Sequence, residues 1–313
     1  STPTLLFFLK QRKHIFPYNL NGVVDMPYIM ENISLYENQS IKQTNMVVKH
    51  NIIYSRDTPV NQFKYTRLNL DKYILIAGET VVGDILQWQK DGMRYVEELV
   101  LSGATTIVFP IDIQYEYQLK HQFEAARASL SVFPLDYCLV LRMPLLLVKP
   151  SIIRYCKKHL VPAIITRIQN IDEMNEIPWS WIKEASFPYN LAFFPQFNNR
   201  QSVSLLKWEQ ILTDQLLPHY ASTITEHMPL SKDVLKLIGI YPFKGFMRCR
   251  GEVSYNIIHQ KYENCLNNDE KSYYDKIECT IFKNKVIRAG KQWFLTQSLG
   301  EELLIKVPGF FHS

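Results

Sequence analysis

The stretch Leu237-Ile-Gly-Ile-Tyr-Pro-Phe-Lys-Gly245 separates two regions of different texture. Upstream of it, between residue 72 and about residue 235, apolar runs that read as buried strands alternate with helical patterns. Downstream of it, Val253–Ile258 and Lys276–Phe282 read as strands, and a turn and a further strand follow over residues 284–291. This order predicts an α/β region followed by a small all-β region.

The upstream region contains five continuously apolar runs of the kind found in parallel sheets, where strands are covered on both faces. Their starts are about 26 to 32 residues apart, the length of one strand plus one helix. The runs are Tyr73–Ala77, Thr105–Phe109, Tyr137–Leu141, Ala163–Thr166 and Leu191–Phe194. We therefore expect an α/β fold, a TIM-like (β/α) barrel. Only about 170 residues separate the first of these runs from the 237–245 stretch, whereas an eight-stranded barrel typically needs about 250, so we expect the barrel to be incomplete or distorted.

The chain is expected to divide into three segments. Residues 1–71 are irregular and contribute strands to a small β-sandwich, residues 72–240 form the barrel, and residues 241–313 form the β-sandwich and a C-terminal tail. The run Asn45–Tyr54 reads as a hairpin around a Lys-His-Asn turn. Such a hairpin is either part of the sandwich or an unrelated N-terminal element.

Composition excludes several classes of protein. With 313 residues, 47% hydrophobic and 21% charged, the chain is an ordinary globular one. Its net charge of +5 comes from scattered basic residues, which argues against a nucleic-acid interface. The five cysteines are odd in number and contain no Cys-x-x-Cys, so neither a disulfide framework nor a structural zinc site is expected. No run approaches the roughly 20 apolar residues that span a bilayer. We expect a cytoplasmic protein that binds neither nucleic acid nor membrane.

Three stretches, in the same order, resemble the cyclic amidohydrolases, the hydantoinase and dihydroorotase group of the amidohydrolase superfamily. They are Val96–Val108, Lys236–Gly245 and Ile281–Lys291. In that group a Gly-Leu-Tyr-Pro-x-Lys-Gly run leaves the catalytic barrel for a small β-sandwich. The resemblance also implies one or two metal ions, held by a His-x-His pair after the first barrel strand and by His, Lys and Asp residues on later strands.

The chain departs from the group at those metal ligands. The two histidines of the first strand correspond to Gly83 and Ile85, which offer no lone pair to a metal. Arg167 stands where the group has a bridging lysine, and an arginine stays protonated. The run Ala192–Phe197 has no histidine, which leaves His227 as a counterpart of the sixth-strand histidine. We therefore expect no metal at the end of the first strand, and no cofactor.

A set of polar residues follows the predicted strands. Because active sites of barrels lie at the C-terminal ends of the strands, these side chains are expected to face one cavity. They are Glu79, Asp112, Arg142, Arg167 and Gln196. One interpretation is a pocket for a small anionic or zwitterionic ligand, clamped by Arg142 and Arg167. The other is that the charges pair with one another and close an inactive site. In both, the two arginines should converge close to Asp112 or Glu79.

Two functions remain open. The first is an amidohydrolase-like pseudoenzyme that has lost its metal centre and binds a protein partner or a second copy of itself; the resemblance permits this, since the superfamily includes inactive members that hold an active partner. The second is a hydrolase of cyclic amides or other C–N bonds with a rearranged site, for which the candidate catalytic residues are Asp84, Asp112, Glu226 and His227. We favour binding over catalysis.

Overall fold

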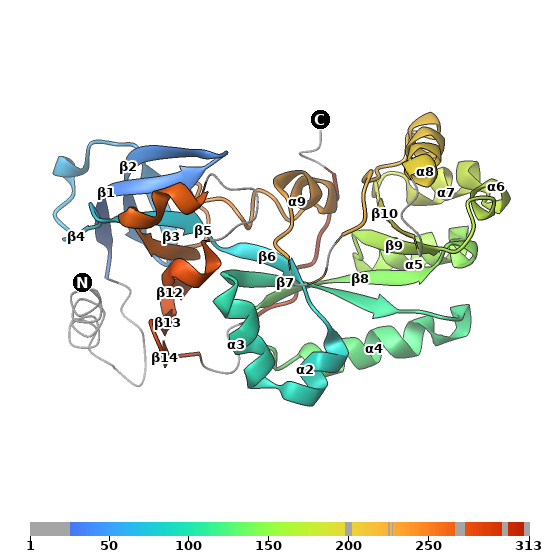
Figure 1. Cartoon of the computed structure of the whole chain (residues 1–313), viewed down its shortest axis with the longest axis horizontal. Helices are drawn as coiled ribbons and strands as arrows, with labels where there is room; N and C mark the ends of the chain where they lie inside the picture. The colour runs from blue at the N-terminus through green and yellow to red at the C-terminus, as the bar shows by residue number, and fades with distance from the viewer. Residues whose placement is uncertain are drawn as a thin grey trace. The chain divides into compact units, whose positions relative to one another are not determined.

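The computed structural model describes residues 26–197, 202–224, 226, 228–266, 273–295 and 300–309 (Figure 1). The described residues fall into two compact units. Unit 1 takes its residues from Ser1–Gly78, Val100–Thr105 and Phe246–Thr296. Unit 2 takes its residues from Glu79–Leu99, Thr106–Gly245 and Gln297–Ser313.

Unit 1 is built on a nine-stranded sheet that joins strands from both ends of the chain. Its order is β14-β13-β12-β11-β5-β1-β2-β3, with β4 beside β1. The pairing is antiparallel except for β1, which runs parallel to β4 and β5. The strands are β1 (Tyr28–Glu37), β2 (Ser40–Lys49), β3 (Ile52–Arg56), β4 (Thr66–Asn69), β5 (Tyr73–Ala77), β11 (Tyr255–His259), β12 (Ile277–Phe282), β13 (Lys285–Ala289) and β14 (Gln292–Trp293).

This sheet folds back on itself around one core. Ile53 in β3 donates its backbone N–H to Gly251 at 3.0 Å and accepts from Arg250 at 2.7 Å. Buried residues of β1 and β2 share a cluster with buried residues of β11 and β12. The described strands of the all-β region therefore belong to one nine-stranded sheet with a shared core. The predicted hairpin over residues 45–54 is confirmed: β2 and β3 pair antiparallel, and His50 and Asn51 adopt the positive φ angles of a tight turn.

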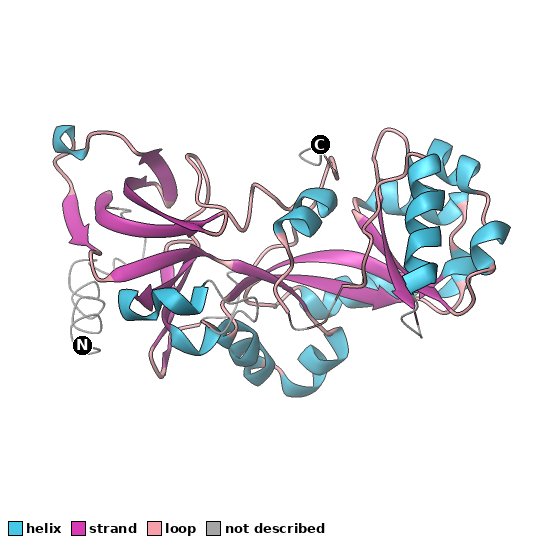
Figure 2. Ribbon diagram, turned by 45° about the horizontal axis from the view of Figure 1, so that its top comes forward, coloured by secondary structure: helices cyan, strands magenta, loops and turns pink. Residues whose placement is uncertain are grey.

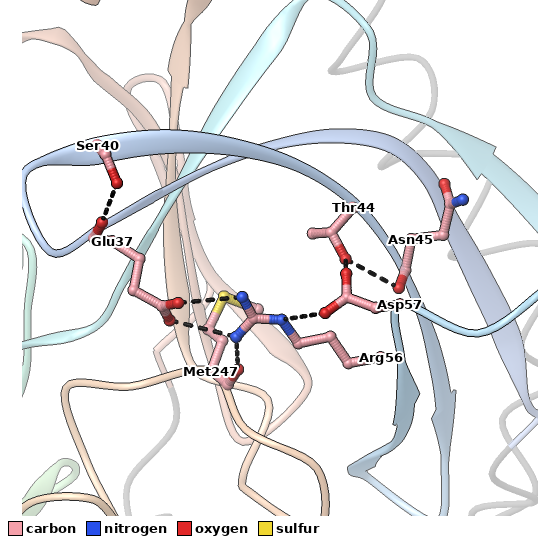
Figure 3. Close-up of polar contacts among 7 residues, drawn as sticks. All are labelled: Glu37, Ser40, Thr44, Asn45, Arg56, Asp57 and Met247. Atoms are coloured by element: carbon pink, nitrogen blue, oxygen red, sulfur yellow. Dashed lines mark hydrogen bonds and ion pairs between the residues drawn. The ribbon is translucent and has the colours of Figure 1, made fainter.

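Arg56 fixes β3 to its surroundings (Figure 3). Its guanidinium donates to Glu37 at 3.0 and 3.3 Å and to the carbonyl oxygen of Met247 at 2.8 Å, and it lies 3.4 Å from Asp57. The Arg56 and Glu37 side chains are only 13% and 10% exposed. The contacts with Glu37 and Asp57 raise the pKa of Arg56 even though burial opposes this shift. These contacts join the ends of β1 and β3 to the segment after Gly245, so the role of the cluster is structural.

Unit 2 contains an open five-stranded sheet with the order β10-β9-β8-β7-β6 (Figures 1 and 2). The pairs β7–β8, β8–β9 and β9–β10 are parallel. The strands are β6 (Glu79–Val82), β7 (Ala104–Asp112), β8 (Asp136–Pro144), β9 (Ala163–Ile168) and β10 (Ala192–Phe197). Eight helices connect or follow these strands: α2 (Ile85–Asp91), α3 (Met93–Leu101), α4 (Leu119–Leu130), α5 (Pro150–His159), α6 (Glu173–Glu176), α7 (Trp179–Ser186), α8 (Ser202–Asp214) and α9 (Lys232–Ile238).

Five short 3₁₀ turns complete the described elements. They are η1 (Val60–Gln62), η2 (Glu116–Gln118), η3 (Leu145–Leu147), η4 (Gln260–Leu266) and η5 (Tyr274–Lys276). Within the ranges that the structure describes, no helix is both long enough and apolar enough to cross a membrane.

The predicted α/β class is confirmed, and four of the five predicted strands lie in the parallel sheet. The fifth prediction was wrong: Tyr73–Ala77 is β5, in the middle of the sheet of unit 1. The edge strand of the parallel sheet is instead β6, which begins just past Gly78. Periodicity could not separate the two, because both are short apolar runs. Over the described residues the sheet has two edge strands, β10 and β6, and beyond them only isolated bridges, from Phe193 to His219 and from Val81 to Pro229, so a closed eight-stranded barrel is not present there.

The 237–245 stretch is held in place by a buried ion pair. Gly239 ends α9 with φ of 91°, and its N–H bonds to the carbonyls of Leu235 and Lys236. Lys244 then contacts the carboxylate of Asp136 at the start of β8, and these side chains are 7% and 1% exposed. The other oxygen of Asp136 accepts the backbone N–H of Glu301 at 2.8 Å. One carboxylate thus ties together the stretch, β8 and residues near the C-terminus.

Candidate functional site

The residues at the C-terminal ends of β7 to β10 come together as the strand spacing predicts. Asp112 lies opposite Arg142 in the β7–β8 pair, and Arg167 lies opposite Gln196 in the β9–β10 pair. Because neighbouring parallel strands end at the same edge of a sheet, these four side chains start from one edge.

Arg142 is the centre of this cluster. Its Nε and Nη2 donate to the two carboxylate oxygens of Asp112 at 2.9 and 2.5 Å, which is the bidentate geometry of a strong pair. Its Nη1 donates to Glu226 at 2.5 Å. The Arg142 side chain is 21% exposed, while Asp112 and Glu226 are 42% and 46% exposed. The hydrogen bond with Asp112 is the largest cause of a raised pKa for Arg142, and it outweighs the opposing effect of burial.

Arg167 joins the same carboxylate from the other side. Its Nη1 lies 3.3 Å from Asp112, and its Nη2 donates to the carbonyl oxygen of Ile113 at 3.4 Å. The side-chain oxygen of Gln114, with the amide turned to satisfy its neighbours, accepts from Nη2 at 2.8 Å and from Nη1 at 3.1 Å. The predicted convergence of Arg142 and Arg167 on Asp112 is therefore confirmed.

The four charged groups balance one another. Two guanidinium groups face two carboxylates, so the cluster of Asp112, Arg142, Arg167 and Glu226 is neutral by itself. Both oxygens of Asp112 already accept hydrogen bonds from Arg142.

The remaining candidates take other positions. Glu79 begins β6 and so lies at the opposite end of its strand from the expected one; the prediction failed because β5 was taken as the first barrel strand. Asp84 follows β6 and caps α2, where it accepts the N–H of Leu86 at 2.8 Å. The side-chain oxygen of Gln196 is buried without a partner in the described structure. His227 lies outside the described residues.

The sequence analysis did not place two of the residues that contact the arginines at this site. Gln114, which bonds to Arg167, lies two residues past the end of β7, and its place after a strand is the only sequence signal for it. Glu226 was a candidate for catalysis but not for a partnership with Arg142. It lies in an irregular segment between α8 and α9, where no periodicity indicates which residue turns towards the sheet.

Gly83, which the sequence comparison predicts at a metal-ligand position of the cyclic amidohydrolases, has no room beside it for a larger side chain. A Cβ at position 83 would lie 2.5 Å from Ile107 Cγ2 and 2.7 Å from Phe109 Cε1, so the space that a histidine would need is filled by the core. The hydroxyl of Tyr95 lies 3.1 Å from the same point and accepts the backbone N–H of Asp84. Among the described residues no three His, Cys, Asp or Glu side chains are grouped as a metal would require.

Comparison with known proteins supports the fold. No protein-family model matches the chain, and no curated protein matches its sequence. Among solved structures, a D-hydantoinase matches with a TM-score of 0.57 at 9% identity, over 91% of this chain and 99% of that one. The dihydropyrimidinase from Brevibacillus agri matches with a TM-score of 0.58 at 7% identity over the same shares of the two chains. The L-hydantoinase from Arthrobacter aurescens matches with a TM-score of 0.53 at 11% identity, over 88% and 99%. The resemblance to the cyclic amidohydrolases is thus confirmed, and at these identities it concerns the fold alone.

Proposed function

We propose that this chain is an amidohydrolase-like protein that acts by binding, as a pseudoenzyme or partner subunit, and not by metal-assisted hydrolysis. One observation carries the proposal: the guanidinium of Arg142 is bound by both Asp112 and Glu226 at the strand ends. A cation supplied by the protein itself neutralises the carboxylates that lie at this edge of the sheet.

The chemistry of arginine explains why this favours binding. Hydrolysis of an amide at neutral pH needs an activated water, and a metal ion activates one by lowering its pKa towards 7. A guanidinium has no lone pair for a metal and keeps its proton, so it can neither coordinate a metal nor act as a base. The filled space at Gly83 supports the same conclusion.

We also propose that the strand-end cluster binds a small anionic ligand, which must displace a carboxylate from an arginine in order to bind. Since the two guanidinium groups are already matched by two carboxylates, an anion would have to replace one of them. Glu226 is the candidate for replacement, because it makes a single contact with Arg142 and is 46% exposed. We therefore expect Glu226→Gln to increase the stabilisation that small carboxylates give in thermal melts.

The experiment on activity uses the ring classes named for the structural relatives. Purified full-length chain is incubated with hydantoin and with a dihydropyrimidine, with and without added zinc or manganese. The proposal predicts no ring opening above the buffer rate. Ring opening that is lost on chelation would overturn it.

The alternative function is a hydrolase of C–N bonds with a rearranged site. The half-exposed carboxylates of Asp112 and Glu226 are the observation in its favour. It predicts turnover that Asp112→Asn abolishes, while Glu209→Gln on the exposed surface of α8 leaves it unchanged. Absence of turnover in the unmodified chain rejects this alternative.

The partner and the location of the protein are further parts of the proposal. We propose a protein partner or a second copy of the chain, in the cytoplasm. Sedimentation of the purified chain at several concentrations distinguishes self-association from the binding of a different protein, because only self-association shifts the mass without an added component.

A further inference from the structure

A pocket of about 580 Å³ lies within unit 2 and shares no residue with the strand-end cluster. Its walls come from the segment after β8, the start of α5, the end of α6, α7 and the residues between α6 and α7. Six apolar side chains form most of the lining: Leu146, Val148, Pro150, Ile177, Pro178 and Trp181. The volume is within the usual range of about 300–1,000 Å³ for small-molecule sites.

Trp181 is the most unusual part of this lining. Its side chain belongs to α7 and is 66% exposed, whereas Trp179 in the same helix is 7% exposed and donates its indole N–H to Met174 at 2.8 Å. Trp179 is therefore a core residue, while Trp181 and the 45% exposed Leu146 present apolar surface to the pocket. An indole face that is open to solvent is the best aromatic surface for a cation.

The charges of the pocket decide what kind of ligand it fits. Lys149 is 3.6 Å from Glu116, and Ser151 donates to the other oxygen of Glu116 at 2.8 Å, so the lysine charge is already matched. Glu176 also lines the pocket, and no described residue forms an ion pair or hydrogen bond with its side chain. The three ionised groups together leave one negative charge.

We propose that this pocket binds a small organic cation with an apolar body. The Trp181 indole covers the alkylated ammonium group, and the Glu176 carboxylate supplies the counter-charge. The proposal is independent of the strand-end cluster, because neither Arg142 nor its carboxylate partners contribute to the lining.

The test uses choline and its neutral isostere 3,3-dimethylbutan-1-ol as probes on the full-length chain. The indole N–H signals of ¹⁵N-tryptophan-labelled protein are followed by NMR, and Trp181→Phe assigns the signal of interest. Choline should shift the Trp181 signal in a saturable way, and the neutral isostere should bind at least about fivefold more weakly, since an exposed cation–π contact is worth about 1 kcal/mol and each 1.4 kcal/mol is tenfold.

Variants separate the two recognition elements. Glu176→Gln should weaken choline binding about fivefold. Trp181→Ala lacks the indole signal, so its binding is followed through the resonances of choline itself, and it should show no binding over the accessible range. Glu184→Gln, a change at an exposed position of the same helix, is the matched control and should leave binding unchanged. Equal binding of choline and its isostere, no effect of Glu176→Gln, or no saturable shift up to about 50 mM choline, about −1.8 kcal/mol at that affinity, would each overturn the proposal.

Discussion

At residue 83 the core leaves no room for a side chain larger than that of glycine. Ile107, Phe109 and Tyr95 surround the Cα of Gly83 closely enough that no side chain fits without movement. Since these three residues are buried, the obstacle is packing and not backbone conformation. The side chains that fill the space beside Gly83 thus come from β7 and α3.

This packing predicts the effect of a single methyl group. Gly83→Ala should lower the free energy of unfolding by about 1–3 kcal/mol, the usual cost of overpacking. In a background of Ile107→Ala, which removes the nearest atom, the same change should cost less. Denaturant melts of the four proteins of this cycle measure the difference. Equal costs in both backgrounds would show that Ile107 is not the obstacle.

The strand-end arginines are partly exposed, and this limits their contribution to stability. Because the Asp112 and Glu226 side chains are more than 40% exposed, water can hydrate their carboxylates when the arginine is removed. Arg142→Met should therefore cost about 1–2 kcal/mol, well below the cost of breaking a fully buried pair. Arg94→Met, whose pair with Glu98 is 82% and 53% exposed, is the control and should cost less than about 0.5 kcal/mol. A loss of 4 kcal/mol or more for Arg142→Met would contradict the partial exposure.

The sequence was sufficient to predict three residues of this site, because each of them lies at the end of a parallel strand. Asp112, Arg142 and Arg167 follow apolar runs that were correctly identified as parallel strands, so their positions at one edge followed from topology. Glu79 was misplaced because Tyr73–Ala77 was taken as the first barrel strand and β6, which Glu79 begins, was not predicted. Glu226 was not foreseen as their partner, since an irregular segment carries no periodic signal.

At the scale of elements, the Lys244–Asp136 pair joins three segments that are distant in sequence. The Tyr-Pro-Phe-Lys-Gly run was noticed for its resemblance to a family, and the structure gives its lysine a structural role. The Asp136 carboxylate accepts from Lys244 and from the backbone N–H of Glu301, and both side chains of the pair are almost fully buried.

Removing one partner of this pair should be costly. Lys244→Met leaves the Asp136 carboxylate buried without its cation, and the expected loss is about 3–5 kcal/mol. The double variant Lys244→Met with Asp136→Asn should recover part of this loss, because no charge is left buried. Thermal or denaturant unfolding measures both proteins. A loss below about 1 kcal/mol for Lys244→Met would show that the pair is solvated in solution.

The end of α5 makes stability depend on pH. Burial, followed by the nearby Arg127 charge, lowers the pKa of His159 below its ordinary value of 6.5. Its ring stacks on Tyr155 at 4.2 Å and meets the edge of Phe123 at 5.4 Å. The folded state thus favours neutral His159, so its contribution is fully present above pH 6.5 and declines as pH falls from 6.5 towards the lowered pKa.

The variant His159→Phe isolates this effect. Between pH 7.5 and pH 5, the unmodified chain should lose more stability than the variant, because the variant has no proton to take up at this position. The free energies of unfolding of the two proteins at both pH values provide the measurement. Identical pH dependence would show that His159 titrates alike in the folded and unfolded states.

At the scale of the whole molecule, the α/β class was predictable and the way the chain is shared between its sheets was not. Continuous apolar runs at regular spacing identified β7, β8, β9 and β10. The sheet of the all-β unit includes β5, although no property of Tyr73–Ala77 itself distinguishes this strand from one of the parallel sheet. Its place is decided by its neighbours β1 and β11, and these contacts are not local in sequence.

The likeness to hydantoinases extends over about nine-tenths of the chain and concerns the fold alone. A fold of this kind supports many functions, so activity has to be judged from the site.

The stoichiometry of bound metal tests the central claim most directly. The purified chain is dialysed to equilibrium against zinc and, separately, manganese at tenfold excess, beside a variant that carries Asp112→Asn and Glu226→Gln. Our account predicts the same small metal content in both proteins, well below one ion per chain, because Arg142 occupies the two carboxylates. One or more ions per chain in the unmodified protein, lost in the variant, would contradict it.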